Sequence, residues 1–301
     1  MNILLLAFVL LVWGMNWPLM KLAMNFIPPQ WFGFTRMFIG SLFLFLIVII
    51  QKKYTFPKRG DIPHLFSVGV LQVGLFTVLV NFGLFYNGVG HAVILVYSTP
   101  LWVAPIAIIF FNERLNLIKA FGLVVGVLGI IVLFNPFDFN WSNHEALIGS
   151  AALFLSALLW AIAILHVRFV PSQSSILQLM PWHLLVGTII LGISALIFEP
   201  HPVIHWTTFS ILLNLYIGTI ATGLAFWGAV EMSKRFPAVT TSLSLTGVPI
   251  IGVICSLLFL GEKPTPTVLI SLAMLTIGLI CVILGDYQEK KARMGTVSSQ
   301  L

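Results

Sequence analysis

The stretch from Ile62 to Asn112 contains no aspartate, glutamate, lysine or arginine. One helix needs about 20 apolar residues to cross the hydrocarbon core of a bilayer, so this stretch is long enough for two crossings. The whole chain follows the same pattern, with 59% hydrophobic and 8% charged residues, against about 25% charged residues in a soluble domain. The sequence therefore predicts an integral membrane protein.

Charges and clusters of Pro, Gly and Asn divide the chain into ten predicted membrane spans. Their approximate bounds are 3–22, 31–50, 64–86, 89–111, 116–135, 147–169, 175–198, 207–231, 237–260 and 265–286. The N-terminal run lacks the basic start of a signal peptide, so we expect it to be the first span and to be retained. Cys255 and Cys281 both lie inside apolar spans, which gives no sign of a disulfide framework.

Basic residues are distributed very unequally between the connections of these spans. If the N-terminus is cytoplasmic, twelve of them lie at the inner side and two, Lys21 and Lys263, at the outer side. The inner residues are Lys52, Lys53, Lys58, Arg59, Arg114, Lys119, Arg168, Lys234, Arg235, Lys290, Lys291 and Arg293. Because short cytoplasmic loops are rich in Lys and Arg, we expect a multi-pass protein of the inner (plasma) membrane with both termini in the cytoplasm.

The two halves of the chain resemble each other weakly, with matching residues 147 positions apart at first and 149 apart later. The pairs are Trp13 and Trp160, Gly40 and Gly187, Pro100 and Pro249, Glu113 and Glu262, and Gly129 and Gly278. Since five spans is an odd number, the second half must enter the membrane from the opposite side. The predicted fold is an all-α integral membrane protein of ten transmembrane helices as two inverted five-helix repeats, 1–136 and 147–286, with a cytoplasmic polar tail at 287–301.

Several short motifs follow one another in a recognisable order. They are Val-Trp-Gly-Met-Asn-Trp-Pro at 12–18, Phe-Thr-Arg-Met at 34–37, Tyr-Ser-Thr-Pro at 97–100, Asn-Glu-Arg-Leu at 112–115, Gly-Val-Pro at 247–249 and Gly-Glu-Lys at 261–263. Their order and spacing over residues 1–286 resemble an EamA-type member of the drug/metabolite transporter superfamily. The resemblance implies a ten-helix inner-membrane carrier, typically an exporter of amino acids or related metabolites, often driven by a proton or substrate gradient.

Inverted halves suit a secondary active transporter, because they can expose one midplane site to each side of the membrane in turn. A passive channel or facilitator for small solutes is the alternative that the pattern leaves open. An intramembrane enzyme is disfavoured, since no span contains an Asp or a central Glu. We expect a small-molecule substrate, contact with the lipid bilayer, possible proton coupling, no nucleic acid partner, no cofactor or metal, and a monomer or weak homodimer.

Arg36 is the first candidate for the transport path, because a guanidinium inside a span is costly unless it pairs, meets water or reaches the surface. Facing a cavity, it would offer two parallel donors to a carboxylate, which suits an amino acid or an organic acid. It could also extend back to the outer surface or lock two helices together. A cationic substrate would lack an obvious counter-ion, since the spans carry no buried acid.

Trp13, Asn16, Trp17 and Met20 share one face of the first span, an arrangement that fits either a cavity wall or helix packing. Trp160, which matches Trp13 in the repeat, is also a candidate for the transport path. So is Tyr97, in the Tyr-Ser-Thr-Pro motif.

Four further residues complete the candidates. Asn81 shares a face of the third span with Gly74 and Thr77, for which helix packing is the alternative role. His183 occupies the position of Arg36 in the second half and could accept a coupling proton or bond a neighbouring helix. Glu113 and Glu262 precede the fifth and tenth spans, where a carboxylate favours the positive end of a helix dipole, so we expect structural caps.

Overall fold

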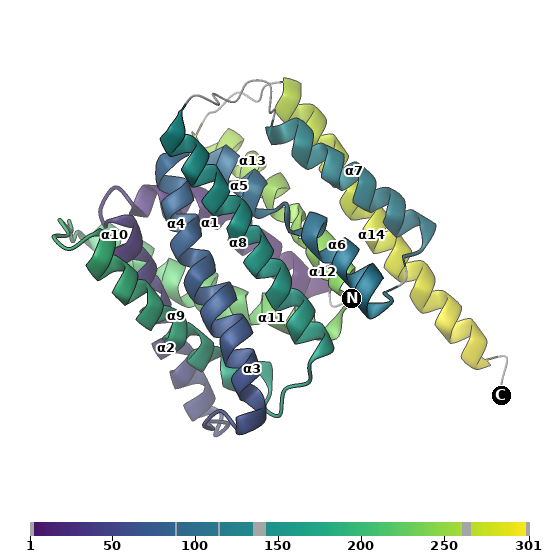
Figure 1. Ribbon diagram of the computed structural model, residues 1–301, viewed down its shortest axis with the longest axis horizontal. Helices are drawn as coiled ribbons and strands as arrows, with labels where there is room; N and C mark the ends of the chain where they lie inside the picture. The colour runs from purple at the N-terminus through teal and green to yellow at the C-terminus, as the bar shows by residue number, and fades with distance from the viewer. Residues whose placement is uncertain (1–2, 88, 114, 135–142, 261–265, 299–301) are drawn as a thin grey trace.

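The computed structural model describes residues 3–87, 89–113, 115–134, 143–260 and 266–298, and within these ranges it contains helices and no strands (Figure 1). The elements are α1 (Ile3–Ala23), α2 (Pro29–Ile50), η1 (Arg59–Asp61), α3 (Ile62–His64), η2 (Leu65–Leu75), α4 (Phe76–Tyr86), α5 (Val89–Val96), α6 (Thr99–Phe111), α7 (Leu117–Phe134), α8 (His144–Phe169), α9 (Ile176–Phe198), α10 (Thr208–Tyr216), η3 (Ile217–Leu224), α11 (Ala225–Arg235), α12 (Ala238–Leu245), α13 (Gly247–Leu260) and α14 (Pro266–Ser298). The protein is an all-α membrane protein, as predicted.

Six helical stretches of the described residues are long and apolar enough to cross a membrane, and four shorter apolar helices complete the set of ten. The long stretches begin at Leu4, Pro29, Arg59, His144, Ile176 and Thr208. The last helix, α14, continues to Ser298, so the polar tail is an extension of the tenth span.

Two spans predicted as continuous helices are broken. The fourth span divides between α5 and α6 at Tyr97 and Ser98, and the ninth divides between α12 and α13 at Thr246. Each break lies just before a proline, Pro100 or Pro249, which cannot donate to the carbonyl four residues earlier and clashes with it. At the first break Thr99 Oγ1 replaces the lost donor by donating to Val96 O at 2.9 Å. At the second break Thr246 Oγ1 donates to Leu243 O at 2.6 Å, within the last turn of α12.

The third and eighth spans each contain a π-helical segment at an equivalent position, η2 and η3. Each segment contains two glycines, Gly69 and Gly74 in η2 and Gly218 and Gly223 in η3. Each glycine of η2 precedes its counterpart in η3 by 149 residues, which is also the separation of Pro100 and Pro249. The missing side chains of the glycines allow close packing: a Cβ on Gly218 would lie 3.1 Å from Arg36 O. The π-helical segments therefore bring backbone of one half close to backbone of the other.

Equivalent helices from the two halves also pack on each other. The antiparallel pair α2 and α9 meets where Ser41 Oγ donates to Pro181 O at 3.0 Å. The pair α7 and α14 packs through Gly122 and Gly278, and it lies side by side at one edge of the bundle in Figure 1. Antiparallel contact between equivalent helices is what a two-fold relation in the membrane plane produces.

Carboxylates tie each half to helix starts of the other half. Glu113 accepts hydrogen bonds from Ala238 N at 2.7 Å and Val239 N at 3.0 Å, so it caps α12. Glu113 therefore caps a helix distant in sequence, and not α7, the helix that follows it. Glu199 caps α2 in the same manner through Gln30 N at 3.1 Å. Glu262 lies outside the described residues.

Candidate functional site

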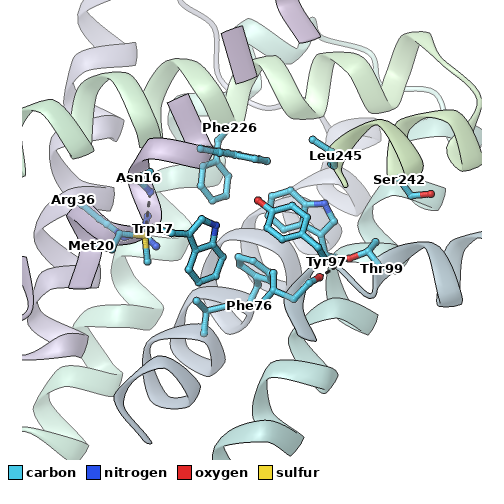
Figure 2. A pocket seen from close by; sticks show the side chains of 14 residues that line it. Asn16, Trp17, Met20, Arg36, Phe76, Tyr97, Thr99, Phe226, Ser242 and Leu245 are labelled. Atoms are coloured by element: carbon cyan, nitrogen blue, oxygen red, sulfur yellow. Dashed lines mark hydrogen bonds between the residues drawn. The ribbon is translucent and has the colours of Figure 1, made fainter. Parts of the chain in front are cut away.

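A cavity lies between the two halves, beside the break in the fourth span (Figure 2). It is lined by Trp13, Asn16, Trp17, Met20, Arg36, Phe76, Val80, Val96, Tyr97, Thr99, Trp160, Phe226, Ser242 and Leu245. The space measures about 600 Å³ with its open part included. None of these side chains is acidic.

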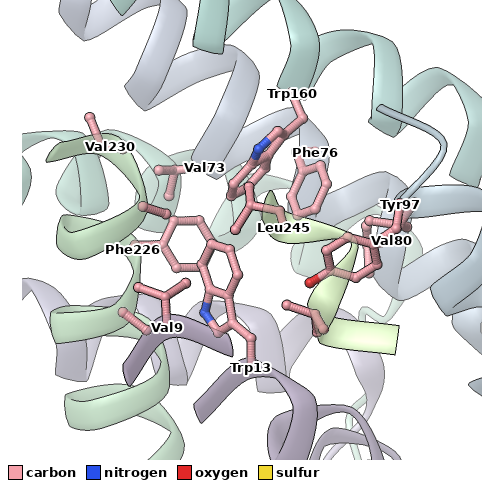
Figure 3. Close-up of a cluster of buried hydrophobic side chains, with 14 of the residues drawn as sticks. Val9, Trp13, Val73, Phe76, Val80, Tyr97, Trp160, Phe226, Val230 and Leu245 are labelled. Carbon is pink, nitrogen blue, oxygen red and sulfur yellow. The ribbon is translucent and has the colours of Figure 1, made fainter. Parts of the chain in front are cut away.

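The centre of this cavity wall is a group of aromatic rings drawn from both halves (Figure 3). Trp13 and Trp160, the equivalent tryptophans, meet edge to face with ring centroids 5.5 Å apart. Phe76 lies 4.6 Å from Trp160, and Phe226 lies 5.4 Å from Trp13. Edge-to-face packing of this kind fixes ring positions, so the wall is a rigid apolar surface.

Arg36 places a positive charge at the edge of this apolar surface. The side chain is 3% exposed, and its partners in the described part of the chain are the Thr222 hydroxyl at 3.4 Å from Nη1 and the face of Phe32 at 5.7 Å. Among the described residues, Arg36 Nε has no hydrogen-bond partner. A buried guanidinium without a carboxylate is costly, and a bound anion would offset that cost.

The polar groups of the two tryptophans differ. Trp13 donates its indole N–H to Ala221 O in η3 at 3.0 Å. No acceptor for the Trp160 N–H occurs among the described residues, and Trp160 lines the cavity. Asn16 also lines it, with Nδ2 directed at Met20 Sδ, 3.0 Å away, and its oxygen without a partner. The cavity therefore presents a donor and an acceptor in addition to the guanidinium.

Of the predicted path residues, Trp13, Asn16, Arg36, Tyr97 and Trp160 surround the cavity, together with Trp17 and Met20 on the same face of α1. The other two lie away from it. Asn81 is buried and donates from Nδ2 to Pro29 O at 2.9 Å, which ties the third span to the start of α2. His183 is fully buried with both ring nitrogens unpartnered, and its backbone packs against Gly69 in η2.

Sequence reasoning missed most of the cavity wall supplied by the third, eighth and ninth spans. Phe76, Val80 and Phe226 are apolar residues in apolar spans, and nothing in the sequence distinguishes them from lipid-facing neighbours. Ser242, a small polar residue of the ninth span, also lines the cavity. Thr99 could have been found, because a threonine beside an intramembrane proline marks a helix break.

Comparison with known proteins agrees with this architecture. The model of the EamA-like transporter family matches residues 1–135 and again 147–284. A Bacillus subtilis protein named "Uncharacterized transporter YoaV" is 28% identical over 90% of this chain and 92% of its own length. An Escherichia coli protein named "Probable amino-acid metabolite efflux pump" is 22% identical, with 96% of each chain covered.

A solved crystal structure shares the fold. It superposes with a TM-score of 0.78 at 17% identity and covers 93% of this chain and 97% of its own. The likeness to that structure concerns the fold alone, whereas the family model covers both halves of the sequence. The chain belongs to the EamA-like transporter family.

Proposed function

We propose that this protein is a secondary active transporter that exports amino acids or related small organic acids across the inner membrane by alternating access. The observation that carries the proposal is the Arg36 guanidinium, buried without a carboxylate beside an aromatic cavity between two repeated halves. In this proposal the guanidinium binds the substrate carboxylate, and the rings around Trp13 and Trp160 contact its apolar part.

Packing on one side of the cavity favours a carrier over an open channel. Asn16, Trp17 and Met20 line the cavity, whereas the residues 147 positions later are Ala163, Ile164 and Val167, all buried in packed helix seams. A path that is hollow on one side and filled on the other is the arrangement expected for one state of an alternating-access cycle.

The driving force is part of the proposal, with a proton as the candidate coupling ion. His166 Nδ1 lies 2.8 Å from Ser67 Oγ, and its ring contacts the His64 ring at 4.8 Å between centroids, so two histidines from opposite halves meet away from the cavity. Histidine is the side chain whose charge changes most readily near neutral pH. Substrate-dependent proton movement in proteoliposomes would identify the coupling.

The carboxylate requirement can be tested with matched ligand pairs. We expect phenylalanine and leucine to bind purified protein and change the fluorescence of the cavity tryptophans. Phenethylamine and 3-methylbutylamine, which lack only the carboxylate, should bind at least about tenfold more weakly. Arg36→Lys should reduce this preference, because it keeps the charge and loses the two-donor fork. Equal binding of acids and amines would contradict the proposed substrate class.

Transport itself is tested by counterflow in proteoliposomes. A carrier accelerates uptake of a labelled ligand when the same unlabelled ligand is trapped inside, whereas a channel does not. Absence of this acceleration, with ligand binding intact, would favour the passive facilitator.

A further inference from the structure

The ends of two equivalent helices carry equivalent cationic contacts. Lys21, in the last turn of α1, donates from Nζ to Leu84 O at 3.2 Å. Arg168, in the last turn of α8, donates from Nη1 to Lys234 O at 3.2 Å. Lys21 and Arg168 are separated by 147 residues, the spacing of Trp13 and Trp160. The two contacts are therefore counterparts at opposite ends of the inverted repeat.

Both acceptors belong to the last turn of a helix, Leu84 in α4 and Lys234 in α11. Carbonyls at a helix C-terminus lack intrahelical donors and lie at the negative end of the helix dipole. A cation from a neighbouring helix is a favourable partner for such a group. Each contact thus joins the end of the first span in a half to the end of a third span.

The packing below the two contacts is different. One turn below Lys21, Trp17 on α1 and Val80 on α4 face the cavity, and α1 and α4 make few direct contacts. Below Arg168, the equivalent residues Ile164 and Ala229 are buried, and α8 packs directly on α11. The Lys21 contact lies one helical turn from cavity-lining residues, whereas the Arg168 contact ends a packed seam.

The Arg168 side has additional connections. Lys234 Nζ donates to Ser172 Oγ at 3.0 Å, just beyond the end of α8. On the Lys21 side, the described contact between α1 and α4 at this level is the single hydrogen bond to Leu84. The two closures are therefore unequal in strength, and the Lys21 closure is the weaker one.

We propose that Lys21 and Arg168 are the two gate latches of the transport cycle, one at each face of the membrane. Both bonds are formed in this structure, so neither gate is open in it. Opening toward the Lys21 side breaks the bond to Leu84 O, and opening toward the Arg168 side breaks the bond to Lys234 O. The inference rests on the proposed alternating access, and it adds the residues that set the balance between the two states.

Cysteine labelling measures this balance without any substrate. The reporter is Ser242→Cys, a cavity position, in a chain with Cys255→Ala and Cys281→Ala, and the probe is a membrane-impermeant maleimide added to either face of the membrane. Removal of Lys21 by Lys21→Gln should raise labelling from the Lys21 side by about threefold to tenfold and lower it from the other side. Arg168→Gln should shift labelling in the opposite direction.

Two variants serve as controls. Lys21→Arg keeps a cationic donor and should label like the parent protein, and Lys53→Gln removes an exposed cation that takes part in neither contact. Equal labelling changes on both sides after Lys21→Gln, or no change, would overturn the gate assignment. Because labelling needs no transported molecule, a wrong substrate class would leave these expected shifts intact, and loss of transport with normal shifts would count only against the proposed function.

Discussion

Helices α2 and α9 are the clearest pair for comparing the two halves, because they are equivalent, antiparallel and in contact. Arg36 and His183 occupy the same position on them, 147 residues apart. The backbone surroundings match, since Arg36 packs beside Gly218 in η3 and His183 beside Gly69 in η2. Only Arg36 lines the cavity. The repeat has kept its backbone packing and has lost its side-chain equivalence.

The sharpest way to break this comparison is to remove each polar group in turn. Arg36→Gln should weaken carboxylate ligands by about 30-fold or more, since loss of a buried charge pair costs about 2–5 kcal/mol. His183→Gln should change affinity by less than about threefold, because the ring lies outside the cavity. Tryptophan fluorescence titration with phenylalanine gives both values. A comparable loss in the two variants would show that the positions share one function.

Glycine substitutions test whether the backbone packing is equivalent in the two halves. An alanine Cβ at Gly40 would lie 2.8 Å from Gly218 O, and one at Gly187 would lie 3.3 Å from Gly74 N and closer still to Val73. Both substitutions should destabilise the protein by about 2 kcal/mol, because backbone atoms cannot move aside easily. Gly126→Ala is the matched control, since nothing lies within 4 Å of its added Cβ. Thermal denaturation in detergent should rank Gly126→Ala above the other two variants.

The smallest expected effect separates the two tryptophans. Trp13→Phe removes the hydrogen bond to Ala221 O and should cost about 1 kcal/mol of stability. Trp160→Phe shrinks a ring in the same cluster but removes no hydrogen bond in the described structure, so it should cost about 1 kcal/mol less stability than Trp13→Phe and should also alter ligand affinity. Equal losses of stability would mean that the two indoles have the same structural role.

Hydropathy and charge were sufficient to predict the ten spans. The thickness of the bilayer sets the length of an apolar stretch, and basic residues mark the loops, so both can be recognised from composition. Hydropathy and charge could not show that the span predicted at 89–111 is broken at Tyr97, since a broken and a continuous helix have the same hydropathy. The π-helical segments η2 and η3 have no sequence signature beyond their glycines.

The site was only partly predictable for a related reason. Trp13 and Arg36 were recognisable because a polar or amphipathic group in a span needs an explanation. His183 needed the same explanation, and only the packing of α9 against η2 shows that it lies outside the cavity. Glu113 could be recognised as a cap, but its partner helix α12 begins 125 residues later in the chain.

The contact between Trp13 and Trp160 has a geometric consequence. When two equivalent residues of a two-fold repeat touch, they lie next to the symmetry axis, and an operation that exchanges the halves maps this pair onto itself. In the proposed alternating access, the indole pair would therefore keep its centroid distance of 5.5 Å while the surrounding helices move. A molecule resting on it would keep its depth in the bilayer, and only its exit would change.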